Sequence, residues 1–114
     1  MATRYHINLP DPALARGSDP AWSFAANGAD EYARELQAAL RGDALFERWR
    51  ARQPDPDAID PALGATDPAA TVDGGQHDLH MELVVVTSLP GGVLKHRLRL
   101  LAGNGWELRD VSAA

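Results

Sequence analysis

The chain contains four histidines, two of which lie close together in the sequence. His77 and His80 are three residues apart, whereas His6 and His96 are distant from them. Imidazole nitrogens are common zinc ligands, but a zinc site needs three or four ligands that converge. We predict a strand in this region, and the alternation of a strand would send His77 and His80 to opposite faces of the sheet. We therefore interpret His77 and His80 as two partly exposed polar positions on a sheet and expect no metal.

Three other kinds of reactive site are also poorly supported. Asp55, Asp57 and Asp60 have part of the spacing of a calcium loop, but the required glycine and the distal glutamate are missing. The chain has no cysteine, which excludes thiolate nucleophiles and disulfides. It also lacks the glycine-rich phosphate loops and the Gly-x-Ser-x-Gly element of common enzyme families. The sequence therefore favours a non-catalytic role without a cofactor.

An aromatic residue among arginines provides the leading functional hypothesis. Trp49 is flanked by Arg48 and Arg50 and follows Phe46 by three residues. Partly exposed aromatic residues bordered by arginine are typical of the centres of protein interfaces. We predict a protein-interaction module that binds a protein partner or a second copy as a homodimer, with Phe46, Trp49 and Arg50 as the interface. The alternative interpretation is that Trp49 covers the hydrophobic core with its edge.

A second hypothesis is a small-ligand-binding protein or enzyme. Its pocket would lie between the sheet and a long loop at residues 53–77, because loops over a rigid scaffold often carry function. The candidate lining residues combine hydrogen-bonding, cationic and aromatic groups, and they are His80, His96, Arg97, Trp106 and Arg109.

Weak nucleic-acid binding is a third and less favoured hypothesis. Lys95, Arg97, Arg99 and Arg109 are candidates for a small basic face. Binding to a phosphate backbone usually requires a net-basic domain or stripe. The chain has a net charge of -5, which lies entirely within residues 53–77, so its charge pattern disfavours polyanions.

The stretch 53–77 also divides the chain by sequence. It contains five aspartates and no lysine or arginine, together with Pro54, Pro56, Pro61 and Pro68. Proline interrupts regular hydrogen bonding, and uncompensated aspartates resist burial. We predict a single domain over residues 1–114 interrupted by a Pro/Asp-rich loop at 53–77, with room for a helical turn from Pro56 to Leu63.

The N-terminal part shows two periodicities. Residues 4–9 and 22–26 alternate apolar and polar side chains, which predicts two short strands. From Ala29 the apolar residues follow helical spacing, with Asn27 or Asp30 as candidate caps. Gly42 then interrupts the pattern, and residues 44–52 are expected either to continue this helix after a kink or to form a second one.

The C-terminal part leaves two alternatives open. Residues 81–87 and 106–111 are strand-like, whereas residues 93–102 fit a helix with Arg97 on its apolar side or a strand that turns at Asn104-Gly105. Helix propensity favours the helix. The fold class is therefore α+β: a single-layer sheet of about four strands with two helical segments on one face, in a split βαβ (ferredoxin-like) topology. The alternative is a C-terminal antiparallel meander with an N-terminal helical hairpin.

Composition indicates the setting of the protein. Apolar residues make up 45% of the chain, yet none of its apolar runs approaches the roughly 18 residues of a membrane helix. The first residues lack the apolar core of a signal peptide. Arginine greatly outnumbers lysine, which is typical of GC-rich bacterial genomes. We expect a small bacterial protein of the cytoplasm that does not bind membranes.

Overall fold

The computed structural model describes residues 2–114. Within these residues the chain forms four strands and three α-helices, in the order β1 (Thr3–Leu9), α1 (Ala29–Arg41), α2 (Ala44–Ala51), β2 (Thr71–His77), β3 (His80–Thr87), α3 (Gly91–Ala102) and β4 (Glu107–Ala113). Short 3-10 helices occupy the connections, at η1 (Pro12–Leu14), η2 (Pro56–Ala58) and η3 (Pro61–Gly64). The α+β class expected from the sequence is confirmed.

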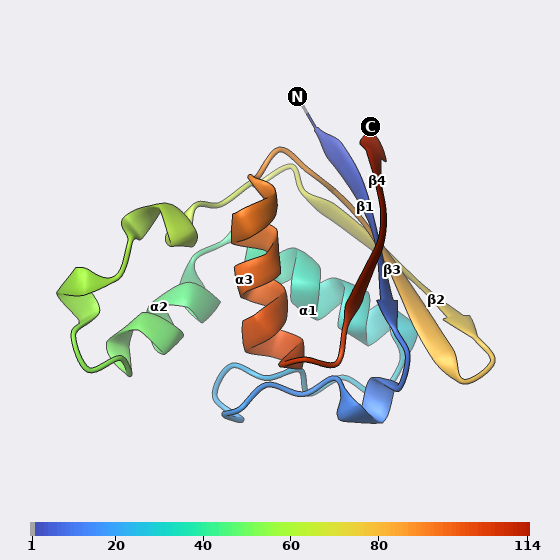
Figure 1. The fold of residues 1–114 in the computed structure, drawn as a ribbon, viewed down its shortest axis with the longest axis horizontal. Helices are drawn as coiled ribbons and strands as arrows, with labels where there is room; N and C mark the ends of the chain where they lie inside the picture. Colours follow the sequence, from blue (N-terminus) through green and yellow to red (C-terminus); the bar gives the residue numbers. More distant parts are fainter. Residues whose placement is uncertain (1) are drawn as a thin grey trace.

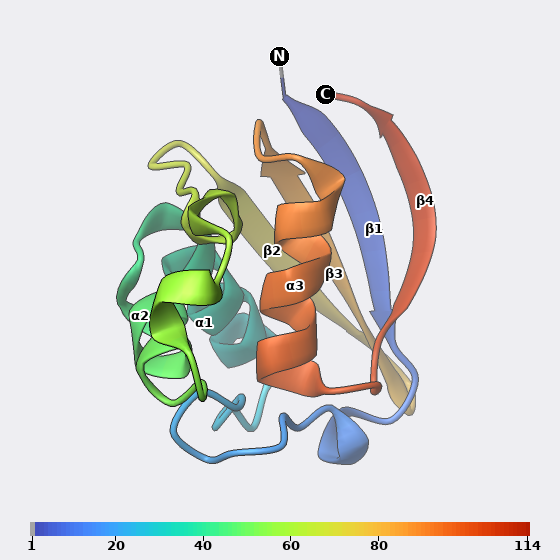
Figure 2. The same ribbon diagram turned by 60° about the vertical axis from the view of Figure 1, so that its left-hand side comes forward.

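The four strands form one antiparallel sheet in the order β2-β3-β1-β4. β1 is an inner strand, which pairs with β3 along its whole length from Thr3↔Thr87 to Leu9↔Met81. The helices lie on one side of this sheet (Figures 1 and 2), and in Figure 2 α3 lies in front of β3. β4 lies at the edge of the sheet, beyond α3. The helix layer therefore leaves β4 largely uncovered.

Alternating side chains on the inner strands explain this arrangement. In β3 every second residue from Met81 to Thr87 is buried, and the residues between are half-buried. Ile7 and Leu9 of β1 are fully buried on the same side. Because alternate side chains point to opposite faces, a single apolar face is enough to hold the helices.

The helix α1 forms as its spacing predicts. Tyr32, Leu36 and Leu40 make a buried stripe on the side that faces the sheet. The predicted side-chain caps are wrong, because no side chain accepts a hydrogen bond at the start of the helix. The backbone carbonyl of Gly28 accepts from the amides of Glu31 and Tyr32. Gly42 separates α1 from α2, so residues 44–51 form a second helix.

Residues 91–102 form a helix, as propensity favoured, and the meander alternative is wrong. The helix buries Leu94, Leu98 and Leu101, which a single strand could not place on one face. Gly103 follows it with a φ of 60°, a left-handed conformation that glycine adopts without strain. Lys95 and Arg99 remain exposed on the outer side of the helix.

The predicted strand at residues 22–26 is wrong, although its pattern of burial is correct. Trp22, Phe24 and Ala26 are buried and the residues between them are not. The hydrogen bonds go elsewhere, since the amide of Phe24 donates to the carbonyl of Leu101. Period-two burial here marks an extended loop that packs against the end of α3.

The segment 53–77 contains regular secondary structure and is not a continuous loop. The predicted helical turn is present as η2 and η3, and the side chain of Asp60 accepts a hydrogen bond from the amide of Ala62. Residues 71–77 form the edge strand β2. A strand is compatible with the aspartate here because Asp73 is exposed.

Pairing of β2 with β3 also corrects the expectation for the two histidines. His77 and His80 lie opposite each other across a hairpin, and their rings stack with centroids 5.4 Å apart. The turn between them places Asp78 at a φ of 54°. Paired residues of two strands share a face, whereas the prediction placed both histidines on a single strand.

Candidate functional site

The residues predicted as an interface pack mainly against their own chain. Phe46 is buried, and a ring edge of Trp49 lies against His96 with the ring centroids 4.6 Å apart. The guanidinium of Arg50 contacts the carboxylate of Glu47 at 3.3 Å and donates to the carbonyl of Pro56 at 3.0 Å. The bond to Pro56 holds the segment after α2 against α2, and the contact of Trp49 with His96 holds α2 against α3.

The five residues predicted as a ligand pocket are not brought together. His96 and Arg97 lie on the side of α3 that faces α2, as their contacts with Trp49 and Phe46 show. His80 is at the tip of the β2–β3 hairpin. Trp106 and Arg109 belong to the β4 side of the molecule.

Arg97 is fully buried and is bound by carbonyl groups. Its guanidinium donates to the carbonyls of Ala39 at 2.7 Å, Leu63 at 3.0 Å and Ala65 at 2.8 Å. The carbonyl of Ala39 belongs to the last turn of α1, where free carbonyls and the helix dipole favour a cation. Burial lowers the pKa of Arg97, and the carboxylate of Asp43 acts in the opposite direction. Arg97 thus connects α1, α3 and the segment at η3.

His96 lies beside this cluster and is almost completely buried. Burial is the main cause that lowers its pKa, and the charges of Arg99 and Arg97 lower it further. Its Nδ1 atom has no hydrogen-bond partner within the described chain. The ring packs between Phe46 and Trp49, so the neutral form fits this environment best.

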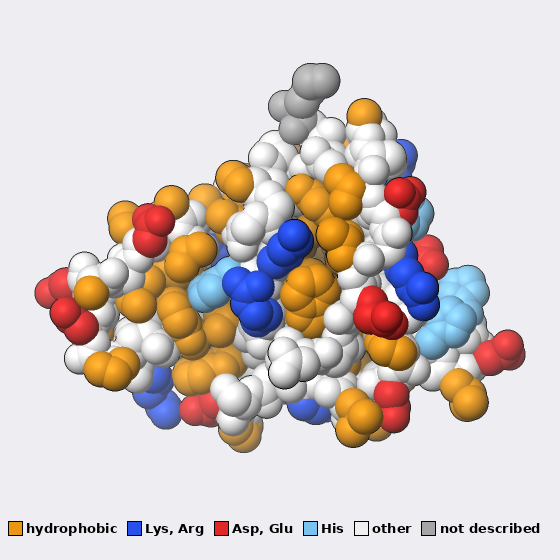
Figure 3. All heavy atoms as spheres, in the orientation of Figure 1, with side chains coloured by type: hydrophobic (Ala, Val, Ile, Leu, Met, Phe, Trp, Pro, Cys, Tyr) orange, Lys and Arg blue, Asp and Glu red, His pale blue; other side chains and the backbone are white. Residues whose placement is uncertain are grey.

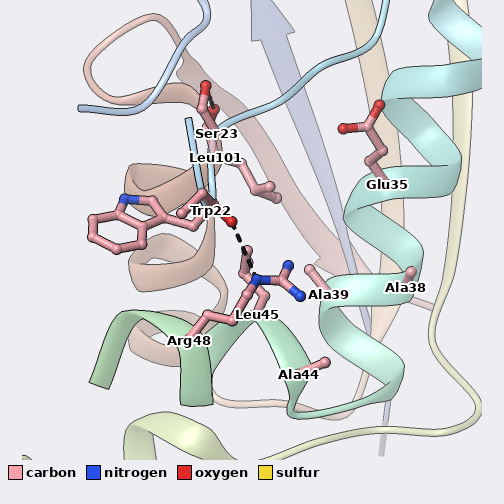
Figure 4. Close-up of a pocket in the computed structure, with 10 residues that line it drawn as sticks. Trp22, Ser23, Glu35, Ala38, Ala39, Ala44, Leu45, Arg48 and Leu101 are labelled. Carbon is pink, nitrogen blue, oxygen red and sulfur yellow. Dashed lines mark hydrogen bonds between the residues drawn. The ribbon is translucent and has the colours of Figure 1, made fainter. Parts of the chain in front are cut away.

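A surface hollow of about 320 Å³ lies between α1, α2 and the loop before them. Figure 4 shows Arg48 reaching from α2 to the loop and Glu35 on the facing side of α1. The guanidinium of Arg48 donates to the carbonyl of Ala21 at 3.1 Å, and the carboxylate of Glu35 accepts from the amide of Ala25 at 2.9 Å. Both charged groups therefore anchor the 21–25 loop.

The β4 side of the molecule has a different character. All seven residues of β4 are exposed, although the strand is paired with β1. Leu108 is 37% exposed and Val111 is 48% exposed. Their partners in the register are Ile7 and Tyr5, which are buried on the helix side of the sheet. Leu108 and Val111 consequently face the helix side at a place that α3 does not cover.

Trp106 extends this apolar surface at the start of β4. It is partly buried against the core, and its Nε1 atom donates to the carbonyl of Gly103 at 3.0 Å. The hydrogen bond satisfies the polar atom of the indole, so that the ring is free for apolar contact. We call Trp106, Leu108 and Val111 the β4 strip.

Charged residues of both signs lie near the β4 strip. Figure 3 shows hydrophobic side chains between Lys and Arg side chains over α3 and acidic side chains next to β4. The basic residues on the helix side are the exposed Lys95 and Arg99 of α3. Glu107 and Asp110 of β4 are also exposed, but they pair with Asn8 and His6, so their side chains lie on the helix-free face of the sheet. The guanidinium of Arg109 is 3.9 Å from the carboxylate of Glu107.

Sequence reasoning missed the β4 strip, although the alternation of the last strand was visible. Lys95, Arg99 and Arg109 were candidates for a basic face, but only the fold shows that Lys95 and Arg99 border an apolar surface. The absence of a covering helix over β4 had no signal in the sequence, because it depends on the strand order.

Other classes of site find less support in residues 2–114. No group of three or more histidine, aspartate and glutamate side chains has the arrangement of a metal site within this range. None of the described helices combines the length and the apolar character needed to cross a bilayer. Comparison with protein-family models, with curated proteins and with solved structures finds no match to this chain.

Proposed function

We propose that this chain is a non-catalytic protein-interaction module whose contact surface is the β4 strip. The observation that carries the proposal is the exposure of Leu108 and Val111 on the helix side of an otherwise covered sheet. Side chains at equivalent positions on the inner strands are buried, so the surface resembles a core that lacks one layer. Contiguous exposed apolar surface of this kind is typical of a binding site.

The location differs from the interface expected from the sequence. Phe46 is buried and Arg50 binds its own chain, so these residues contribute to internal packing. Trp49 is half-buried and contacts His96. The β4 strip has the same combination of an aromatic residue with nearby cations, in Trp106, Lys95 and Arg99, and it adds exposed aliphatic side chains.

We also propose that the fold is of the split βαβ (ferredoxin-like) type. The strand order β2-β3-β1-β4 with antiparallel neighbours supports this assignment. So do the connections, since α1 and α2 lie between β1 and β2, and α3 lies between β3 and β4. The bacterial cytoplasmic setting stays a prediction from composition.

Site-specific photo-crosslinking in the cell tests the contact surface. A benzoylphenylalanine residue is introduced either at Val111 or, as a matched control, at Leu79, which is an exposed apolar residue at the hairpin tip. We expect a discrete protein adduct at Val111 and none at Leu79. Absence of an adduct at Val111, or the same adducts at both positions, would count against the β4 strip as a contact surface.

A further inference from the structure

We infer that the β4 strip binds an amphipathic helix of a partner protein, and that this helix presents acidic side chains toward α3. The inference rests on the proposed function and adds the chemical class of the partner. Two observations carry it. The described helices leave the apolar surface of β4 uncovered, and two cations without an ion-pair partner among residues 2–114 lie beside that surface.

The two cations, Lys95 and Arg99, lie on the side of α3 that faces away from α2. A Cβ atom at Gly91 would lie 3.4 Å from the hydroxyl of Tyr5, so the first turn of α3 packs over β1. An α-helix turns by about 100° per residue, which places Lys95 about 40° and Arg99 about 80° around the axis from Gly91. His96 is about 140° from Gly91, and its ring lies against α2. Lys95 and Arg99 therefore come between β1 and α2 on the open side of the helix, next to β4 (Figure 2).

The cations are also level with the β4 strip. α3 runs in the same direction as β1 (Figure 2). Its first turn is level with Val111, because Tyr5 lies next to that turn and pairs with Val111. Four residues of helix and two residues of strand both advance the chain by about 6 Å. Lys95 is therefore level with Leu108, and Arg99 is level with the start of β4. Figure 3 shows basic side chains over α3 next to hydrophobic side chains on the β4 side.

The chain itself does not supply negative charge at this border. Lys95 and Arg99 are exposed, and neither takes part in the ion pairs within residues 2–114. They are one helical turn apart, so their charges repel each other. The acidic residues of β4, Glu107 and Asp110, lie on the helix-free face of the sheet. Carboxylates of a partner are therefore the complement that this border lacks.

A helix fits the surface better than an added strand does. A strand paired with the free edge of β4 would lie in the plane of the sheet, so it would leave Leu108 and Val111 uncovered on the helix side. The register shift of β4 against β1 also leaves Arg109 as an extra residue, and such a bulge disturbs regular pairing along an edge. A helix laid over β4 would complete the helix layer, with its axis about 8–10 Å from that of α3.

The dimensions of the surface specify the pattern of the partner helix. The β4 strip extends about 16 Å from Trp106 to Val111, which is the length of about three helical turns. The apolar side chains of the partner would follow the spacing i, i+3 or i+4, and i+7. Two acidic residues four apart on the flank toward α3 have the same rise as Lys95 and Arg99.

Selection from a random library of phage-displayed peptides, each about 16 residues long, tests the partner class. We expect the wild-type chain to enrich peptides that combine apolar residues at helical spacing with acidic residues on one flank. The double variant Lys95→Glu, Arg99→Glu should instead enrich peptides with basic residues on that flank, because the specificity follows the sign of the border.

Fluorescence anisotropy with the best synthetic peptide from the wild-type selection gives the size of the effect. The double variant should bind this peptide at least about 10-fold more weakly, and lysines in place of its acidic residues should restore binding to the variant. This rescue separates a loss of binding from a loss of folding. Arg34→Glu with Arg52→Glu changes the net charge equally at exposed residues and should bind as the wild type does. Val111→Glu should abolish binding, whereas Leu79→Glu at the hairpin tip should not.

The inference is overturned if no peptide is enriched, if the enriched peptides lack acidic residues, or if the wild type and the double variant bind the same peptide equally. These outcomes remain distinguishable from failure of the proposed function. A crosslinked adduct at Val111 in the cell would then keep the β4 strip as a contact surface and exclude an acidic helix as its partner. An adduct with the mass of two copies of this chain would have the same meaning.

Discussion

Replacement of Arg97 by methionine should destabilise the protein through the carbonyl groups that the guanidinium binds. Methionine keeps most of the apolar volume but cannot donate to Ala39, Leu63 or Ala65. A buried carbonyl without a partner costs about 1–3 kcal/mol. Ala39 is buried, so loss of the hydrogen bond to its carbonyl should cost the full amount. Leu63 and Ala65 are half-buried, so water can replace part of the hydrogen bonding that their carbonyls lose. Removal of a buried charge offsets a further part.

The expected net loss is about 3 kcal/mol in the free energy of unfolding, which is a large share of the 5–15 kcal/mol typical of a domain. Urea denaturation followed by tryptophan fluorescence at pH 7 measures it. Arg99→Met is the matched control, because Arg99 is on the same helix but exposed. Its substitution should change the stability by no more than about 0.5 kcal/mol.

A second measurement locates the effect. Arg97 connects the segment at η3 to α1, so amide hydrogen exchange in the Arg97→Met variant should increase most at residues 60–67. If Arg97→Met and Arg99→Met lose the same stability, or if exchange increases uniformly along the chain, then the carbonyl contacts of Arg97 do not hold this segment.

Two further predictions concern other buried contacts. Asp67 accepts hydrogen bonds from the hydroxyl of Thr87 and the amides of Ser88 and Ala69, and the bond from Ser88 is the main cause that lowers its pKa. A lowered pKa stabilises the fold above the ordinary value of 3.8, and this stability is lost as the pH falls through the folded pKa. Asp67→Asn should therefore cost about 1–3 kcal/mol in urea denaturation at pH 7 and much less at pH 2; an equal cost at both pH values would contradict the role of the ionised carboxylate. At Gly74, a Cβ atom would lie 2.3 Å from the carbonyl oxygen of Ala29, so Gly74→Ala should destabilise by about 1–3 kcal/mol, whereas Gly92→Ala, which meets nothing within 4 Å, should be neutral or stabilising. Thermal unfolding of both variants measures these changes in stability. Equal stabilities would show that α1 does not pack closely against β2 at Gly74.

Local patterns predicted most of the elements in this fold. Period-two alternation identified β1, and helical spacing identified α1, because each pattern follows from burial of one face. The same rule failed at residues 22–26, where alternate side chains are buried but the amide of Phe24 bonds to the end of α3. The Pro/Asp-rich composition predicted a loop through residues 71–77, but these residues form β2. An edge strand can form there because Asp73 is exposed to solvent. A pattern of burial can therefore be predicted correctly even where the hydrogen-bond partners cannot.

The candidate site was less accessible from the sequence. Helical spacing placed Arg97 on an apolar face, but its carbonyl partners on α1 and η3 are brought near only by tertiary packing. Trp49 was recognised as an aromatic residue among arginines, but its contact with His96 of α3 depends on tertiary packing and could not be predicted. The exposure of Leu108 and Val111 depends on which strand lies at the edge, and strand order is a property of the whole chain.

The central position of β1 has a consequence for the order in which the protein is made. β1 leaves the ribosome before its partners β3 and β4, which follow it in the sequence only after α1, α2 and β2. The sheet cannot begin to close around β1 until residues 80–87 have been synthesised, because β2 pairs with β3 and not with β1. A nascent chain that stops before β3 therefore exposes Ile7 and Leu9 without a strand to pair with. Such truncated chains should depend on chaperones, while a chain that includes β3 and β4 can fold in a single cooperative step.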